Sequence, residues 1–192
     1  MPNEKLRFDP ETHSYWLGGE KLISVTTVLR EAKLFDYTSF HGMYMDRGTA
    51  VHTITELSDK GALIEDKVEN PLLPYLDAWK KFREDTQIEV LATEEPVYHP
   101  IYKYAGMLDR RILWKKKEAV IDIKSGMSAP WHHLQTAAYA KTFNRPMLRF
   151  SLYISGEGTY HLEEHSNYED WDVFRSALAV VNWKRKMGAL KI

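Results

Sequence analysis

The chain has 192 residues, a formal net charge of −1 and no cysteine, which excludes disulfide bonds and thiolate metal sites. A charge so near zero is not by itself typical of a nucleic-acid-binding protein, and a hydrophobic content of 44% excludes a disordered chain. The length suits a single domain over residues 1–192. Because neither a run of roughly 18 apolar residues nor an apolar leader is present, we expect no membrane span and a cytoplasmic location.

Residues 6–23 place short apolar runs on either side of Gly18-Gly19, which predicts a tight hairpin that covers the core as an accessory element. Ser24 follows directly and is placed to cap a short helix. The segment 34–46 is aromatic and irregular, and two interpretations of it stay open. It either packs on the core as a loop between helices, or it is a mobile element that stacks nucleic-acid bases on Phe35, Tyr37 and Phe40.

A helix is predicted over residues 47–60, where Gly61 supplies a usual C-terminal stop. Gly48, His52 and Glu56 recur every four residues and therefore share one face of that helix. A lone histidine on a helix is more often structural than a ligand, so this face gains meaning only from the rest of the chain.

A second helix is predicted to begin at Asn70-Pro71, with the asparagine as cap and the proline in the first turn, and to run to about Asp85. Residues 87–98 predict a strand that Glu94-Glu95-Pro96 interrupts. Because proline within a sheet is largely confined to edge strands, we expect these glutamates to lie on a solvated edge.

Two apolar runs between residues 106 and 124 flank a short polar turn and predict a β-hairpin. Side chains alternate along a strand, so Asp122 and Lys124 point to one face of the second run. A two-residue turn at Lys115-Lys116 sets Asp109 directly opposite Asp122, with Cβ atoms roughly 5 Å apart. A four-residue turn makes the two acids diagonal neighbours, and a three-residue turn separates them onto opposite faces. Lys-Lys has no Asn-Gly preference, so the turn length stays open.

Two facing carboxylates and a lysine are costly to bury unless something compensates them, and a divalent cation does this well. Oxygen ligands suit Mg²⁺ or Mn²⁺. Lys124 is then placed to position or activate a water molecule that attacks a phosphodiester. The alternative is a surface hairpin in which Asp109 pairs with Arg110 or Arg111 and Lys124 merely ends a strand.

After a loop at 127–130, a helix is predicted over residues 131–143. Gln135 and Tyr139 are four residues apart and share one of its faces. Trp131, His132 and His133 precede Gln135 and are candidates to contact a substrate.

Strands at 147–155 and 159–163 and a final helix complete the chain. The order of strands and helices predicts an α/β fold with a mixed central β-sheet flanked by helices. Charge is uneven, because residues 103–117 hold six basic residues and one acid. This stretch, with Arg110 and Lys115, is either a phosphate-binding band or ordinary solvated surface.

The polar residues described above occur in a fixed order: Gly48-x3-His52-x3-Glu56, Gly106-x2-Asp109, Asp122-x-Lys124 and Gln135-x3-Tyr139. This pattern resembles the PD-(D/E)xK nuclease superfamily, in the branch that includes RecB-type and Cas4-type exonucleases. Segments between residues 23 and 139 are also similar to mitochondrial genome maintenance exonucleases. Each motif is loose, but their order and spacing are specific.

The resemblance implies a restriction-endonuclease-like core that holds one or two Mg²⁺ or Mn²⁺ ions. The implied metal ligands are His52, Asp109, Asp122 and the carbonyl of Ile123, with Glu56 as a further candidate. In relatives a glutamate at the place of Glu94-Glu95 can also approach the metal, although a solvated edge strand is the expected place for this pair here. Gln135 and Tyr139 would orient Lys124 or a DNA phosphate. Cas4 proteins lead one to expect a cysteine-bound iron–sulfur cluster, which a chain without cysteine cannot hold.

The implied activity is DNA exonuclease action on single strands or frayed ends, in replication, recombination or repair. An endonuclease with the same site, an inactive nucleic-acid-binding module and a structural protein with a coincidental hairpin remain alternatives. DNA is the expected partner, and whether a recombination or replication protein also binds stays open.

Overall fold

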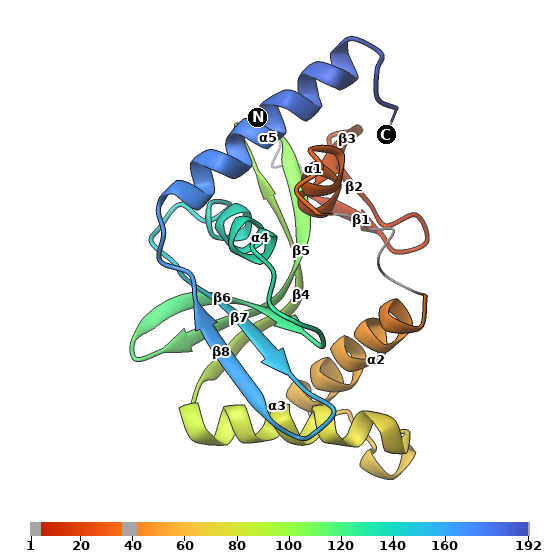
Figure 1. Ribbon diagram of the computed structural model, residues 1–192, viewed down its shortest axis with the longest axis vertical. Helices are drawn as coiled ribbons and strands as arrows, with labels where there is room; N and C mark the ends of the chain where they lie inside the picture. The colour runs from red at the N-terminus through yellow and green to blue at the C-terminus, as the bar shows by residue number, and fades with distance from the viewer. Residues whose placement is uncertain (1–4, 36–41, 192) are drawn as a thin grey trace.

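The structure, a computed structural model, describes residues 5–35 and 42–191, and for residues 42–45 it describes the backbone alone. An eight-stranded mixed sheet runs through it with helices on both sides, so the predicted α/β class with a mixed central sheet is confirmed (Figure 1). Tyr37 and Phe40, the predicted base-stacking residues, lie outside the described ranges. No helix within those ranges is both long and apolar enough to cross a membrane.

The sheet and its helices are defined by the following bounds. The strands are β1 Arg7–Asp9, β2 Ser14–Leu17, β3 Glu20–Ser24, β4 Glu89–His99, β5 Tyr104–Trp114, β6 Lys117–Lys124, β7 Leu148–Ile154 and β8 Tyr160–Glu164. The α-helices are α1 Val25–Glu31, α2 Gly42–Asp59, α3 Leu73–Thr86, α4 Trp131–Ala140 and α5 Glu169–Lys186, and 3-10 turns cover Glu65–Lys67 and Asn70–Leu72.

The long strand β5 lies at the centre of the sheet, and its two edges are paired differently. β4 runs antiparallel along one edge from one end to the other. On the other edge, β3 pairs in parallel at Tyr104 and Ala105, whereas β6 pairs antiparallel only from Arg110 onward. Residues 106–109 therefore have no strand partner on that edge among the residues that the structure covers, and the sheet forks there.

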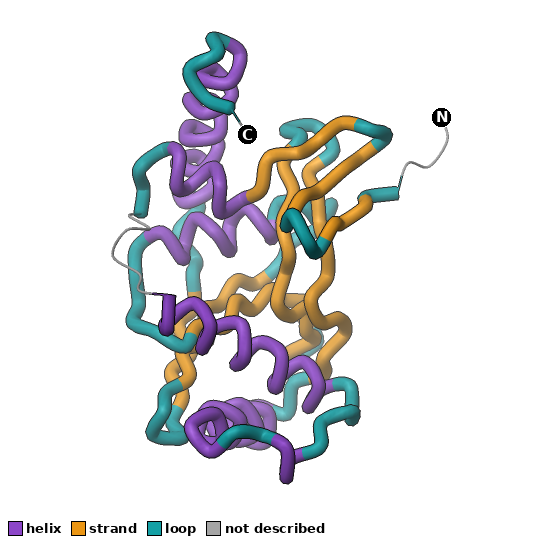
Figure 2. Tube along the Cα trace, turned by 90° about the vertical axis from the view of Figure 1, so that its right-hand side faces the viewer, coloured by secondary structure: helices purple, strands orange, loops and turns teal. Residues whose placement is uncertain are grey.

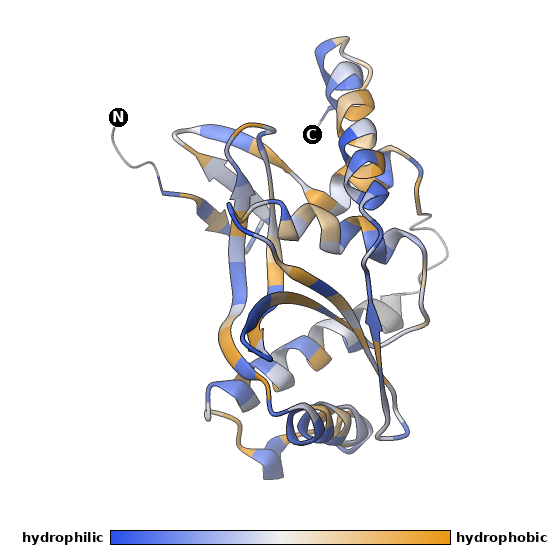
Figure 3. Cartoon of the chain, turned by 90° about the vertical axis from the view of Figure 1, so that its left-hand side faces the viewer, coloured by the Kyte–Doolittle hydropathy of each residue, from blue (hydrophilic) through white to orange (hydrophobic). Residues whose placement is uncertain are grey.

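The helices form two groups, α1, α4 and α5 toward one end of the molecule and α2 and α3 toward the other (Figures 1 and 2). The first group closes a core around Leu29, Leu134 and Phe174, and the second closes a core around Trp79 and Phe82. In Figure 3, α5 shows hydrophobic and hydrophilic residues interleaved along its length, as expected for a helix that buries one face.

The N-terminal segment differs from the predicted accessory hairpin. It folds as two hairpins, β1–β2 and β2–β3, and β3 then joins the central sheet through β5. The predicted turn at Gly18-Gly19 is present, with both glycines at positive φ. Ser24 caps α1 as predicted, since its Oγ accepts a hydrogen bond of 3.1 Å from Thr27 N.

Two predicted helix starts are wrong. α2 begins at Gly42, so the end of the segment that we expected to be irregular is helical. The cap predicted at Asn70 belongs to a 3-10 turn instead, and α3 begins at Leu73 with Pro74 in its first turn and no side-chain cap. The physical reason is that two prolines three residues apart, Pro71 and Pro74, each fit a helix start, and the second one opens the α-helix.

The central hairpin has the two-residue turn that the sequence left open. Lys115 and Lys116 both take left-handed φ values, 50° and 64°, as the two central residues of a type I′ turn do. Trp114 pairs with Lys117 and Arg110 with Ile121. One further step of this register places Asp109 opposite Asp122.

The side chain of Arg110, a predicted nucleic-acid contact, is fully buried and not placed at the surface. Its Nε lies 2.6 Å from Asp59 Oδ2, and its Nη2 donates to Thr55 Oγ1 at 3.0 Å. Its guanidinium also lies over the Trp79 ring, 5.3 Å from the centroid. This buried ion pair joins β5 to the C-terminal half of α2.

We predict that Arg110→Ala lowers the free energy of unfolding by about 3 kcal/mol, the low end for a broken buried pair, because Arg83 still reaches Asp59. The neighbouring Arg111, with a side chain 21% exposed, serves as the matched control. Arg111→Ala removes partly solvated ion pairs and should cost about 0–1 kcal/mol. Chemical denaturation followed by circular dichroism measures both, and equal losses would contradict the assignment.

Candidate active site

Asp109 lies on β5 at the fork of the sheet and is almost fully buried. Its Oδ2 accepts a 2.6 Å hydrogen bond from the backbone N–H of Ile123 on β6. The carboxylate thus occupies the place that a β5 carbonyl would fill if the ladder continued. Its second oxygen, Oδ1, is left to face α2.

His52, Glu94 and Asp109 converge from three different elements, α2, β4 and β5. His52 Nδ1 lies 3.6 Å from Glu94 Oε1 and 3.6 Å from Asp109 Oδ1. The ligand atoms of all three residues lie within 4.8 Å of one another, close enough to hold one metal ion. The structure therefore brings two of the predicted ligands together and adds a third.

Glu94 lies on an edge strand, as expected, because β4 pairs only with β5 among the described strands, but its side chain is 27% exposed and turns toward the site. β4 passes through Glu94 without interruption, but Glu94 has φ +45°, a conformation uncommon outside glycine and often found at functional sites. Its neighbour Glu95 pairs with Arg111 instead, at 2.8 Å. In the sequence, the pair Glu94-Glu95 was the sign that a further acid could join the site. Only the strand register shows that Glu94 is the one that lies opposite Asp109.

A second set of polar contacts surrounds Lys124 on the same side of β6. Its Nζ lies 2.6 Å from Asp122 Oδ2 in an ion pair and donates a 3.0 Å hydrogen bond to Gln135 Oε1. Gln135 Nε2 in turn donates to the hydroxyl of Tyr139 at 3.2 Å. Two residues predicted to orient Lys124 thus lie in one chain of contacts that reaches it.

Tyr139 also explains the glycine of the Gly-x2-Asp motif. A Cβ atom at Gly106 would lie 2.6 Å from Tyr139 Cε1, too close for any larger residue. The glycine lets the ring of Tyr139 pack directly on the forked part of β5. Gly48 is different, because its nearest neighbour would be 3.9 Å away and leaves room for a methyl group.

Trp131 lies beside Lys124, whose Nζ is 4.9 Å from the ring centroid. Phe35 stacks on the same indole at 4.6 Å. Both residues belong to the partly buried rim of the core formed by α1, α4 and α5. In this structure the two rings therefore pack on each other, as the core-packing interpretation of residues 34–46 expects for Phe35.

Several predicted site residues lie elsewhere. Glu56 pairs with Lys60 along α2 at 2.5 Å and does not join the group formed by His52, Glu94 and Asp109. His132 is buried, with Nδ1 2.9 Å from the Tyr153 hydroxyl, so it is not placed to meet a substrate at the surface. Lys115 occupies the exposed hairpin turn, where its Nζ lies over the ring of Trp114.

Burial dominates the electrostatics of the acids. It raises the pKa of Asp109, and the nearby Glu94 carboxylate adds to the effect. Burial likewise raises the pKa of Asp122 to about 6, although the Lys124 ammonium opposes the shift. For His52, burial lowers the pKa, but the carboxylates of Asp109 and Glu94 outweigh it and raise the value to about 9. The raised pKa values of the two acids and of His52 both mean that the site favours added positive charge.

Tyr15 is a neighbour of the site that we did not predict. It lies on β2 and is 1% exposed. Burial raises its pKa, and the charges of Glu94 and Asp109 add to the shift. No local pattern marks it, because its place depends on the long-range pairing of β3 with β5.

The donor set fits a divalent cation. Carboxylate oxygens suit Mg²⁺ and Mn²⁺, and the imidazole of His52 favours Mn²⁺ among the two. Asp122 Oδ2 is buried, and its contact with Lys124 is not aligned as a hydrogen bond, so this oxygen has capacity left for a ligand. The Ile123 carbonyl stays a predicted ligand. The contact of Ile123 with Asp109 is made by its backbone N–H and does not test the carbonyl.

Comparison with known proteins identifies no family. No protein-family model matches the chain, and no curated protein does. Among solved structures, a chain described as "Crystal structure of SSO0001" is similar at 16% sequence identity, over 83% of this chain and 84% of that one, with a TM-score of 0.35. A similarity at that score carries no argument about fold or function.

We predict that Mn²⁺ binding strengthens with pH, because His52 must lose a proton before its nitrogen can bind the ion. With a pKa of about 9, His52 is protonated at pH 7. The affinity should therefore rise about tenfold per pH unit between pH 7 and 8.5. Calorimetric titration measures this, and the His52→Gln variant should bind more weakly and without that slope. A constant wild-type affinity would contradict the role of His52.

We further predict that Asp122→Asn raises the melting temperature of the metal-free protein at pH 8. The folded state raises the pKa of Asp122 to about 6. The neutral form thus contributes stability that is complete below pH 3.8 and lost as the pH rises through 6. The increase in melting temperature caused by Asp122→Asn should therefore become smaller as the pH is lowered toward 4. Asp85 is a control of opposite sign, because its contact with Lys81 lowers its pKa, so Asp85→Asn should stabilise at no pH.

Proposed function

We propose that the chain is a divalent-metal-dependent nuclease that hydrolyses phosphodiester bonds in DNA, on a restriction-endonuclease-like core of the PD-(D/E)xK superfamily. The observation that supports this is the convergence of two groups at the sheet fork. His52, Glu94 and Asp109 form a set of metal ligands, and the Asp122–Lys124 pair lies opposite Asp109 on the next strand.

The chain's own residues divide the work between binding and proton handling. A bound Mg²⁺ or Mn²⁺ ion supplies positive charge that polarises the phosphodiester and lowers the pKa of a water molecule. His52, Glu94 and Asp109 would hold such an ion, and Asp122 on β6 would add a carboxylate beside them. The site is buried and rich in carboxylates, whose charges are poorly solvated. This raises the affinity of the site for a cation.

Lys124 is the group that acts on the attacking water and on the charge of the transition state. An ammonium has three donors. The hydrogen bond to Gln135 engages one of them, while the ion pair with Asp122 holds the ammonium in place without an aligned hydrogen bond. Donors are thus left for a water or a phosphate oxygen. Tyr139 and Gln135 hold the direction of Lys124, and so they are positioning residues.

Exonuclease action on single strands or frayed ends is the form of activity that we propose, on the basis of the resemblance to RecB-type and mitochondrial exonucleases. The alternative is an endonuclease with the same residues. End-labelled linear and covalently closed circular single-stranded DNA, each with Mg²⁺ or Mn²⁺, separate the two. Shortening of linear strands while circles persist supports the exonuclease. Rapid linearisation of circles supports the endonuclease, and DNA binding without cleavage supports an inactive binding module.

We predict that Lys124→Ala retains metal and DNA binding but lowers the turnover rate on the order of 10²- to 10³-fold, as the loss of one transition-state donor does elsewhere. Lys117→Ala is the matched control, because Lys117 lies on the same strand and is exposed. Single-turnover cleavage of the labelled strand measures both rates. Near wild-type cleavage by Lys124→Ala would remove Lys124 from the reaction, and the absence of cleavage by the wild type would overturn the proposed function.

A further inference from the structure

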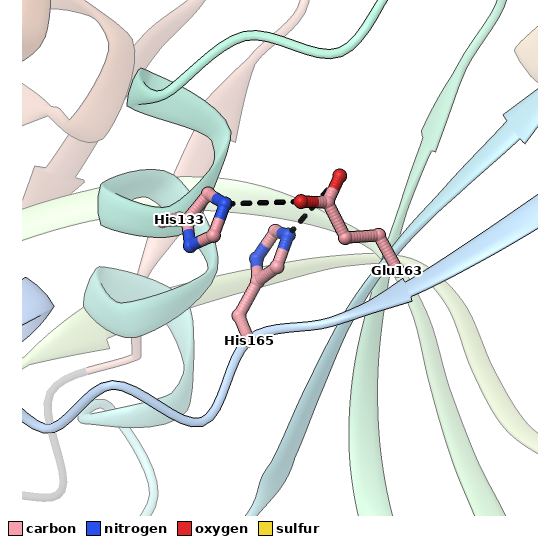
Figure 4. Close-up of side chains that lie close together, drawn as sticks. All are labelled: His133, Glu163 and His165. Atoms are coloured by element: carbon pink, nitrogen blue, oxygen red, sulfur yellow. Dashed lines mark hydrogen bonds and ion pairs between the residues drawn. The ribbon is translucent and has the colours of Figure 1, made fainter.

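A second group of ligating side chains lies outside the candidate active site. His133 comes from α4, Glu163 from β8, and His165 follows that strand (Figure 4). Their ligand atoms lie within 4.8 Å of one another. His133 Nε2 is 3.2 Å from Glu163 Oε1, and His165 Nε2 is 4.0 Å from Glu163 Oε2.

Thr136 can hold His165 in the tautomer that a metal ligand needs. Thr136 Oγ1 lies 3.0 Å from the carbonyl of His133, to which it can donate, and 2.8 Å from His165 Nδ1, where the direction depends on the tautomer of the imidazole. When the hydroxyl donates to the carbonyl, Nδ1 carries the imidazole hydrogen, and Nε2 of His165 presents a lone pair toward Glu163.

This lone pair is unmatched. His165 Nε2 is buried and has no hydrogen-bond partner within the described part of the chain. A lone pair and a carboxylate oxygen facing each other repel, and burial of such atoms without a partner is costly. A cation between them removes both problems. Bonds of about 2.0–2.2 Å to a tetrahedral ion place two ligand atoms about 3.4 Å apart, so His165 Nε2 and Glu163 Oε2, which are 4.0 Å apart, would approach each other slightly on binding.

The surroundings of the group resemble those of bound metals. Ser128 Oγ donates to Glu163 Oε2 at 3.0 Å, and the Nδ1 of His133 faces Asp170 Oδ2 at 3.8 Å. Metal-binding residues are usually held by such outer contacts, a histidine typically by a carboxylate on its other nitrogen. An open pocket of about 560 Å³, lined by Ser128, His133, Glu163 and Asp170 among others, gives access from solvent.

The stacked rings of His133 and His165, 3.9 Å apart and 10° from parallel, require one adjustment. Their Nε2 lone pairs are too nearly parallel to meet at one ion. The His133 side chain is 32% exposed and can rotate, whereas His165 is held by Thr136. A turn of the His133 ring toward Glu163 would direct its Nε2 lone pair to the same ion.

We propose that His133, Glu163 and His165 form a second metal site that takes a transition-metal ion. Two imidazoles and one carboxylate with an open fourth position are a ligand set typical of Zn²⁺. The ion would tie α4 to β8 and so brace the helix that carries Gln135. The proposal does not depend on nuclease activity.

The test measures Zn²⁺ binding by the full chain after chelator treatment and buffer exchange. A His52→Ala background removes a ligand of the first site, so that calorimetric titration with ZnCl₂ reports the second. We expect one equivalent of bound Zn²⁺ in this background. Adding Glu163→Gln should abolish it or weaken it on the order of 100-fold or more, since even the loss of an outer contact costs 10- to 100-fold.

His161→Gln is the matched control, because His161 lies on the same strand, is exposed and is not part of the group. It should leave the bound equivalent unchanged. Zn²⁺ should also raise the melting temperature of His52→Ala but not of His52→Ala/Glu163→Gln. Should the double variant not fold, His133→Gln replaces Glu163→Gln, since that side chain is partly exposed. Absence of Zn²⁺ binding by His52→Ala, or an equivalent that survives both ligand substitutions, would overturn the proposal.

Discussion

The hydrogen bond from Ile123 N to Asp109 Oδ2 is the interaction on which the centre of the structure depends. β6 pairs with β5 only as far as Arg110, and beyond that point the two strands separate. A side chain, and not a backbone carbonyl, then satisfies the amide of β6. The result is a polar gap in the middle of a sheet, with a carboxylate held at its edge, and α2, β4 and α4 contribute the side chains around it.

The neighbours Asp109 and Arg110 show how the two faces of β5 manage buried charge. Arg110 meets Asp59 and Thr55 beneath α2, and its Nη1 also donates to Glu94 Oε1 at 3.3 Å, so its guanidinium is fully paired and touches one acid of the site. On the other face, carboxylates outnumber cations, and burial keeps the pKa values of Asp109 and Asp122 high. The burial of these two acids therefore costs stability unless a positive charge offsets it.

The sequence predicts the fold class, the central hairpin and the helix that carries Gln135, because each depends on local periodicity. It does not predict the turn length, since left-handed Lys115 and Lys116 follow from the twist of the strands and not from residue preference. It also assigns Arg110 to the surface, and it does not show that Glu94, on its edge strand, turns toward Asp109. Both outcomes have one cause, namely that strand register and the contact with α2 are long-range and decide where charged side chains point.

Helix α4 links the two groups of ligating residues. It is buried almost all round, so most of its polar side chains must find partners inside the protein. Gln135 meets Lys124 on one side, while Thr136 meets His165 on another. Positions one residue apart point about 100° away from each other on a helix, so a single helix presents polar groups to two separate places. Any shift of α4 that alters the group at His165 must therefore also move Gln135 relative to Lys124. The position of this helix thus affects both groups of polar residues at once.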